Sequence, residues 1–233
     1  MLEFTTDDFN IKNSKQKFEV RNKLDRIGTE FTQFAKILCP NAKWGHYVTG
    51  KPAYNEQWGA IFPFPVKGNE ELISLYPNVF YSLPQDGSDI LLAANIEFKN
   101  PKEMLIKKCS SRNINMLLSK IQSATGAEIS VRRKVVLRSD NRYYSWTTIL
   151  WDEVNLPDIN ASSCTIQYLN TLQQSIQTPC KENPNDIDYS YEPVVLIKYE
   201  LDIDSLISNS NTKVLLIDKV RLLVPIVEYI SSK

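Results

Sequence analysis

An Asp86-Gly87 pair between two apolar segments constrains the fold of this chain more than any other feature of the sequence. Glycine tolerates the positive φ that tight hairpin turns require, so an Asp-Gly pair with apolar flanks is a strong β-hairpin signal. We therefore expect two antiparallel strands between Asn78 and Asn100, a segment that ends in Glu97-Phe98-Lys99. A second hairpin is expected from Ile129–Leu137 and Tyr143–Trp151, which a polar turn separates.

Three helices are expected around these hairpins. The segment Ser14–Leu38 has apolar residues three and four positions apart, which places them on one helical face. A central helix that is rich in lysine is expected from Pro101 to Gly126. The tail Val214–Ile230 also repeats apolar residues at helical spacing, but its Pro225 predicts a kink or a late start.

The other expected elements are shorter, namely strands at Trp44–Thr49, Gln57–Val66 and Glu192–Leu201 and a helix around Cys164–Ile176. Pro63 and Pro65 cannot donate to a strand ladder. The strand that contains them is therefore expected to be an edge strand or to end early.

The composition fits a folded protein, because 42% of the residues are apolar or aromatic and 23% are charged. We predict a single α+β domain over residues 1–233, with a subdivision into 1–126 and 127–233 as the alternative. Its largely antiparallel sheet is built from the two hairpins, with a long N-terminal helix, a central basic helix and a C-terminal helix. No apolar run reaches the roughly 20 residues of a membrane span and no secretory pattern is present, so we expect a cytoplasmic protein without a membrane partner.

The four cysteines are scattered, and the chain has one histidine, His46. Zinc sites need closely spaced cysteine or histidine ligands, so no metal centre is expected and the cysteines are interpreted as reduced, packed thiols. No nucleophile is linked to His46 by a recognisable motif, which favours a structural or binding role. The sequence thus predicts no resident cofactor.

The net charge of zero conceals a strong asymmetry. The segment Lys99–Arg142 has eleven basic and three acidic residues, a net charge of +8, whereas Asp152–Asp204 has a net charge of −8. Such a division indicates an anion-binding face on the middle third of the chain. The alternative is that the two segments neutralise each other in the fold.

Glu97-Phe98-Lys99 resembles the second half of the PD-(D/E)xK signature of metal-dependent nucleases. In that family one strand supplies an acid and the next an acid-x-Lys pair, so that carboxylates hold Mg²⁺ beside the attacking water. Here the first acid is replaced by Asn78, and Glu71 or Asp89 would have to supply the missing carboxylate. The alternative is a surface Glu and Lys at a strand end.

A second group of residues combines cations and aromatic rings. Alternation along the strand before the second turn puts Arg132, Lys134 and Arg138 on one face. The following segment adds Arg142, Tyr144 and Trp146, and the central helix adds Lys107 and Arg112. Cations beside flat rings suit phosphate contact and base stacking. The alternative is that the tryptophans are core residues and the arginines pair with the acidic segment.

Two families are similar to the N-terminal half. FTTDDFNI and the helix that follows it, with the strands QWGAIFPF and NVFYSLPQDGSDILLAANI, resemble the start of uncharacterised bacterial YktB-like proteins. The same region is similar in pattern to the N-terminal DNA-binding domain of McrB-type restriction proteins. The second resemblance implies recognition of modified bases, and neither assigns a catalytic residue.

The sequence therefore favours a nucleic-acid-binding protein, in the context of a bacterial restriction or antiviral defence system. A metal-dependent nuclease that uses Mg²⁺ is the enzymatic alternative. The third hypothesis is a protein-interaction subunit that binds its partner through the apolar C-terminal helix and an acidic loop.

Overall fold

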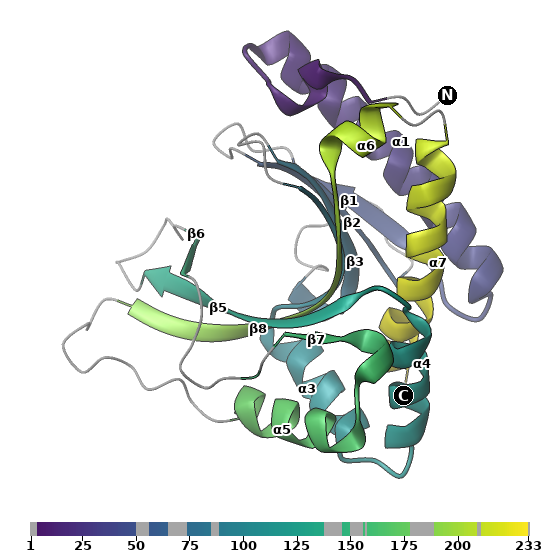
Figure 1. Ribbon diagram of the computed structural model, residues 1–233, viewed down its shortest axis with the longest axis vertical. Coiled ribbons are helices and arrows are strands. Elements are labelled where there is room, and N and C mark those ends of the chain that lie inside the picture. The colour runs from purple at the N-terminus through teal and green to yellow at the C-terminus, as the bar shows by residue number, and fades with distance from the viewer. Residues whose placement is uncertain are drawn as a thin grey trace.

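The computed structural model describes residues 4–49, 56–64, 74–84, 89–137, 146–149, 156, 158–177, 189–208 and 211–232. It shows an α+β fold in which helices lie against the outer, convex side of a strongly curved antiparallel sheet (Figure 1). This is the predicted fold class. Among the described residues, no helix has the length and apolar character needed to cross a membrane.

Seven strands follow one another across the sheet in the order β1-β2-β3-β4-β8-β5-β6, and each pairs with its neighbours in antiparallel fashion. Their bounds in that order are β1 (Gly45–Val48), β2 (Glu56–Phe62), β3 (Asn78–Pro84), β4 (Ile90–Ile96), β8 (Tyr189–Leu201), β5 (Glu128–Leu137) and β6 (Trp146–Ile149). The short β7 (Ile159–Asn160) pairs with the start of β5. Both predicted hairpins, β3–β4 and β5–β6, are present.

The long strand β8 lies between the two hairpins and joins them into one sheet. It pairs with β4 from Ile90 to Ile96 and with the whole of β5. The strand β2 ends at Phe62, early as predicted, but it is not an edge strand because it lies between β1 and β3. The backbone N–H groups of β2 are needed for pairing with strands on both sides. Pro63, which has no N–H group, therefore lies just after β2 and not within it.

The N-terminal helix α1 (Ser14–Leu38) has the predicted bounds. Asn13 caps it by accepting a hydrogen bond from the Gln16 amide at 3.0 Å. The residues predicted for its inner face, from Val20 to Phe31, are buried in the main core. Local signals are sufficient here because an amphipathic stripe and a cap together define both the helix and its buried face.

The central region forms two helices, α3 (Lys99–Cys109) and α4 (Ile114–Ser123), where the sequence predicted one. Serine hydroxyls at the break bond to backbone groups that a continuous helix would use. Ser110 Oγ donates to the Ile106 carbonyl and Ser111 Oγ to the Lys108 carbonyl, both at 2.9 Å. Ser111 Oγ also accepts from the Asn113 amide at 3.2 Å, where a continuous helix would direct that amide to a backbone carbonyl, so a local turn follows α3.

The C-terminal helix α7 (Thr212–Ser231) continues through Pro225 and does not start late. Its apolar residues are buried against α1, α3, α4 and the sheet, so tertiary packing offsets the backbone hydrogen bond that proline removes. The remaining helices are α5 (Ile166–Gln177), the short α6 (Ile203–Ser208), and the 3-10 turns η1 (Thr6–Phe9) and η2 (Ala161–Ser163).

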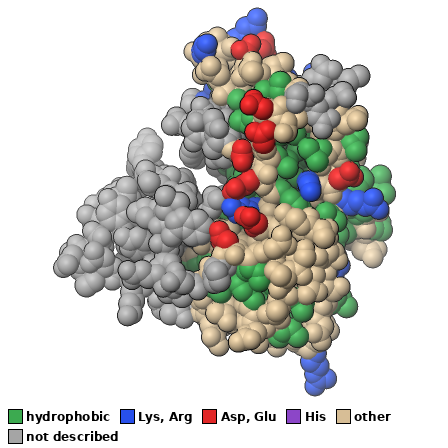
Figure 2. Space-filling model, viewed as in Figure 1, with side chains coloured by type: hydrophobic (Ala, Val, Ile, Leu, Met, Phe, Trp, Pro, Cys, Tyr) green, Lys and Arg blue, Asp and Glu red, His purple; other side chains and the backbone are tan. Residues whose placement is uncertain are grey.

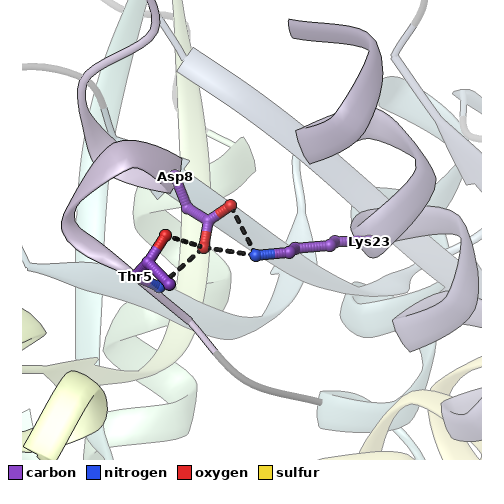
Figure 3. Close-up of polar contacts among 3 residues, drawn as sticks. All are labelled: Thr5, Asp8 and Lys23. Atoms are coloured by element: carbon purple, nitrogen blue, oxygen red, sulfur yellow. Dashed lines mark hydrogen bonds and ion pairs between the residues drawn. The ribbon is translucent and has the colours of Figure 1, made fainter. Parts of the chain in front are cut away.

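One main apolar cluster includes residues of α1, α3, α4, α5, α6 and α7 together with one face of the sheet. It combines residues from both 1–126 and 127–233, for example Leu105 and Ile197. At one end of the molecule the turn η1 is tied to α1 through a buried carboxylate (Figure 3). Asp8 accepts from the Thr5 amide at 2.7 Å and from Lys23 Nζ at 2.6 Å.

Candidate nucleic-acid interface

The sheet face opposite the helices carries a group of aromatic rings from β1, β2 and β3. Strand alternation explains the division, because Ile61 and Val79 point into the main core while their neighbours Phe62 and Phe80 point the other way. None of the helices that the structure describes packs its apolar side on this second face. We call it the open face, a name that refers only to the described helices, since Ala60, Phe62 and Ala93 on this face are buried.

The rings on the open face contact one another in a continuous set. The Trp58 ring centroid lies 5.5 Å from that of Tyr47 and 5.6 Å from that of Phe80. At the end of β2, Phe64 and Tyr76 stack with centroids 5.0 Å apart. All five side chains are half-buried, so their rings are fixed by neighbours and still have accessible surface. Fixed, flat apolar rings are suited to stacking against planar ligands.

The open face becomes polar towards β8 and β5. Lys198 is 5% exposed, and its Nζ lies 2.6 Å from Glu200 Oε1 and 3.7 Å from Glu128 Oε2. Both glutamates retain large exposed surfaces. Figure 2 shows acidic side chains in a column down the middle of the described surface, beside the residues drawn in grey. A buried ammonium that bridges two carboxylates is satisfied internally, so we assign Lys198 no ligand.

The cations proposed from the sequence are not all in one place. Arg132 and Lys134 belong to β5, where their Cα partners on β8 are Val194 and Glu192. The Cα atom of Trp146 pairs with that of Val136 in the β5–β6 hairpin. Arg138, Arg142 and Tyr144 lie outside the described residues.

Lys107 and Arg112 lie in the helical layer instead. Lys107 is an exposed residue of α3 and Arg112 is exposed in the break before α4. Neither forms an ion pair with any residue that the structure describes. Since α3 packs its Leu105 and Cys109 into the main core, these two cations face away from the sheet and cannot share a surface with the rings of the open face.

The residues considered for nuclease chemistry are also separated. Asp89 directly precedes β4 and Glu97 directly follows it, so the two are about 26 Å apart at 3.3 Å per residue. Lys99 begins α3 rather than extending the strand. Glu71 lies outside the described residues. Within the described ranges, no group of three acidic, cysteine or histidine side chains is arranged to hold a metal ion.

Glu97 nevertheless has a defined neighbour. Asn95 Nδ2 donates to Glu97 Oε2 at 3.3 Å, and the Cα atom of Asn95 pairs with that of Asn78 on β3. The residue opposite Asn78 is thus Asn95 and not Glu97. Asn78 and Asn95 are equally far along the chain from the Asp86-Gly87 pair, so this is the register that a two-residue turn at that pair predicts.

His46 has a structural partner on α1. Its Nε2 lies 3.0 Å from Asp25 Oδ1. The ring packs so closely on α1 that a Cβ atom at Gly28 would approach His46 Cδ2 to 2.8 Å and the Tyr81 hydroxyl to 2.5 Å. Burial, and secondly the Asp25 charge, raise the pKa of Tyr81 above its ordinary value. This arrangement fits the structural role predicted for the histidine.

The described cysteines are packed thiols. Burial raises the pKa of Cys109 to about 12 and that of Cys164 to about 11, so neither forms a nucleophilic thiolate near neutral pH. Burial also raises the pKa of Cys39. Cys180 lies outside the described residues.

Comparison with known proteins gives this architecture no family. Neither a scan of family models nor a search of curated proteins found a match to the chain. The class is therefore defined by the fold alone: an α+β protein with one sheet face covered by helices and a second, aromatic face on which none of the described helices packs. The sequence alone did not reveal this face, although Trp58 and Phe62 are an even number of positions apart in β2, which places both rings on one side of that strand.

Proposed function

We propose that this protein binds single-stranded nucleic acid on the open face of its sheet. The observation that carries the proposal is the contiguous set of half-buried rings of Tyr47, Trp58 and Phe80 on a face that no described helix covers. Every nucleobase has a flat face that can stack on such rings, at roughly 1–3 kcal/mol per base. Base stacking of this kind requires unpaired bases, which a duplex does not offer.

The phosphate contacts of this proposal come from the β5–β6 hairpin. Arg132 and Lys134 occupy β5, four strand steps from β2 and hence about 19 Å away along the sheet. A single strand that stacks its bases on β1–β3 can extend across the sheet to these cations. The sequence-based candidates Arg138, Arg142, Tyr144 and Trp146 belong to the same hairpin segment. Lys107 and Arg112 are left out because they lie in the helical layer.

The cytoplasm and a bacterial restriction or antiviral defence system are the setting we propose, on the basis of the sequence resemblance alone. A binding module of this kind would supply recognition, and cleavage would come from another component. The protein-interaction hypothesis has less support from α7, because most of its apolar residues from Leu216 to Ile230 are buried in the core. The acidic loop of that hypothesis lies largely outside the described residues, so its part stays a prediction.

Fluorescence anisotropy with labelled single-stranded and double-stranded DNA and RNA, across a salt series, tests the proposal. Trp58→Leu and Phe80→Leu keep apolar bulk but remove rings, so each should weaken single-strand binding about tenfold. Phe18→Leu is the matched control, since Phe18 is a ring on α1 that is 62% exposed and lies away from the open face. Equal affinity in all three variants would refute the site.

A pair of charge variants separates the two possible surfaces. Arg132→Ala with Lys134→Ala should lower both the affinity and its salt dependence, because fewer counterions are released. Lys107→Ala with Arg112→Ala removes the same charge from the helical layer and should change neither. The opposite result would move the interface to α3 and α4.

The nuclease alternative shares the same assay. If it holds, added Mg²⁺ produces cleavage that Lys99→Ala abolishes while the circular dichroism spectrum is unchanged. Retention without cleavage at any Mg²⁺ concentration supports the binding module.

A further inference from the structure

Two buried amide oxygens on the open face have no hydrogen-bond donor. Asn78 is 1% exposed and Asn95 is 5% exposed, and the Oδ1 atom of each is buried without a partner. Their Cα atoms are directly paired across β3 and β4. Leaving such an acceptor unpaired is costly in a folded protein, where buried polar atoms are nearly always satisfied.

The orientation of the Asn95 amide is determined by its neighbour. Because Asn95 Nδ2 donates to Glu97 Oε2 at 3.3 Å, turning the amide over would set its oxygen against a carboxylate oxygen. The Oδ1 atom is therefore directed away from Glu97 and stays without a donor. Glu97 thus acts as a positioning residue that fixes the direction of the Asn95 Oδ1 acceptor.

The two oxygens can converge on one donor group. Directly opposed residues of an antiparallel pair have Cβ atoms about 4.5–5.5 Å apart. A nitrogen that carries two hydrogens can then give one to each oxygen. Phe62 is fully buried at the end of β2, and the rings of Phe64 and Tyr76 pack against it. These rings provide flat apolar surface at the same end of the open face as the two amide oxygens.

We propose that Asn78 and Asn95 accept hydrogen bonds from the exocyclic amino group of a nucleobase, and that the protein consequently prefers adenine and cytosine to thymine and uracil. This inference rests on the proposed function and deepens it. Adenine carries its amino group at N6 and cytosine at N4, whereas thymine and uracil present a carbonyl oxygen at the equivalent position. That oxygen would face two further acceptors, so the site rejects it.

The rings around Phe62 are the groups that move when a base enters. Both amide oxygens are covered in the structure, and Phe64 and Tyr76 are half-buried side chains on short segments outside the strands. A base that stacks on one of them can reach the amides by displacing side chains without breaking a strand pair.

The decisive probe needs no protein variant. Anisotropy would compare an oligonucleotide of adenines with an otherwise identical one in which purine replaces adenine, so that only the 6-amino group is missing. The wild-type protein should bind the adenine strand about tenfold more tightly, within the range for a good base contact. A ratio near one, with both strands bound, would overturn this inference and leave the proposed function intact.

Variants then locate the preference. Asn78→Leu and Asn95→Leu each leave one acceptor, so each should lower the ratio to about threefold, and the double variant should bring it to about one, while affinity for the purine strand is kept. Ser130→Ala is the matched control: its Oγ is also buried without a partner on this face, but it lies two strands from Asn95, roughly 10 Å away. This control should keep the full ratio.

Thermal melting completes the test. Replacement of a partnerless acceptor by an apolar group of similar shape removes a cost, so Asn78→Leu should melt at or above the wild-type temperature. Asn95→Leu also loses the hydrogen bond to Glu97, which offsets this gain, so it should melt close to the wild-type temperature. A full ratio in both folded leucine variants would refute the assignment. Failure of every strand to bind would overturn the proposed function itself, and this inference with it.

Discussion

Asp8→Ala provides a direct test of how the N-terminal turn is held to the body of the protein. The Asp8 carboxylate accepts from the Thr5 amide at 2.7 Å and forms an ion pair with Lys23 Nζ at 2.6 Å (Figure 3). Its side chain is 6% exposed, whereas that of Lys23 is 31% exposed. The variant removes a capping-box carboxylate and the counter-charge of a partly buried ammonium together.

The magnitude follows from these two losses. A lost cap costs about 1 kcal/mol. Breaking a fully buried pair costs about 3–5 kcal/mol, but the exposed third of Lys23 can regain water, which lowers this contribution to about 1–2 kcal/mol. The free energy of unfolding should therefore fall by about 2–3 kcal/mol.

Urea denaturation of Asp8→Ala, Lys23→Met and the double variant measures the change in the free energy of unfolding. Lys23→Met keeps most of the apolar stem but leaves a carboxylate that is 6% exposed without its counter-charge, so it should cost about 2–3 kcal/mol. The double-mutant cycle should give a coupling energy of about 1–2 kcal/mol. A loss below about 0.5 kcal/mol in Asp8→Ala would place the carboxylate in the class of weak surface groups, and the reasoning would fail.

Four further outcomes are expected. Gly28→Ala should lower the free energy of unfolding by about 1–3 kcal/mol, because its Cβ would overlap the Tyr81 hydroxyl and the ring beneath it; a neutral result would show that the two rings can withdraw. Cys109 and Cys164 should resist iodoacetamide at pH 8 in the folded protein, and mass spectrometry showing rapid labelling would contradict their burial. The pKa values of these two thiols rise on folding from 9.0 to about 12 and about 11, so the folded state holds more protons than the unfolded state at high pH. The stability that the thiols contribute is therefore complete below pH 9 and falls as the pH approaches 11–12. Cys109→Ala should reduce this decrease of the free energy of unfolding with pH. Lys198→Met should change stability by less than about 1.5 kcal/mol, because the buried ammonium loses its desolvation cost along with its ion pairs; a loss above about 3 kcal/mol would show that the two carboxylates depend on it.

Local sequence signals were sufficient for part of the structure. The helix α1 has the predicted bounds because its cap and its apolar stripe are both contained within the helix. The β3–β4 hairpin follows from Asp86-Gly87 because its strands are adjacent in sequence. The break between α3 and α4 was missed, although Ser110, Ser111 and Asn113 belong to the residue types that favour turns.

The candidate site depends on pairings between distant segments. The sequence supplied Arg132, Lys134, Lys107 and Arg112 as one group, and the fold divides this group between the sheet and the helical layer. Such a division is invisible to charge counting, because net charge along a chain does not specify which side of a sheet each segment covers.

By itself, the sequence determined the fold class, the N-terminal helix and the two hairpins, since each depends on periodicity and turn residues within a short segment. Only the tertiary structure decided that β8 lies between β4 and β5 and that the rings of β1–β3 lie together on the face opposite the helices. The physical reason is register. A shift of one residue in pairing turns every side chain to the other face of the sheet, and that choice is made by burial of the whole core rather than by any local segment.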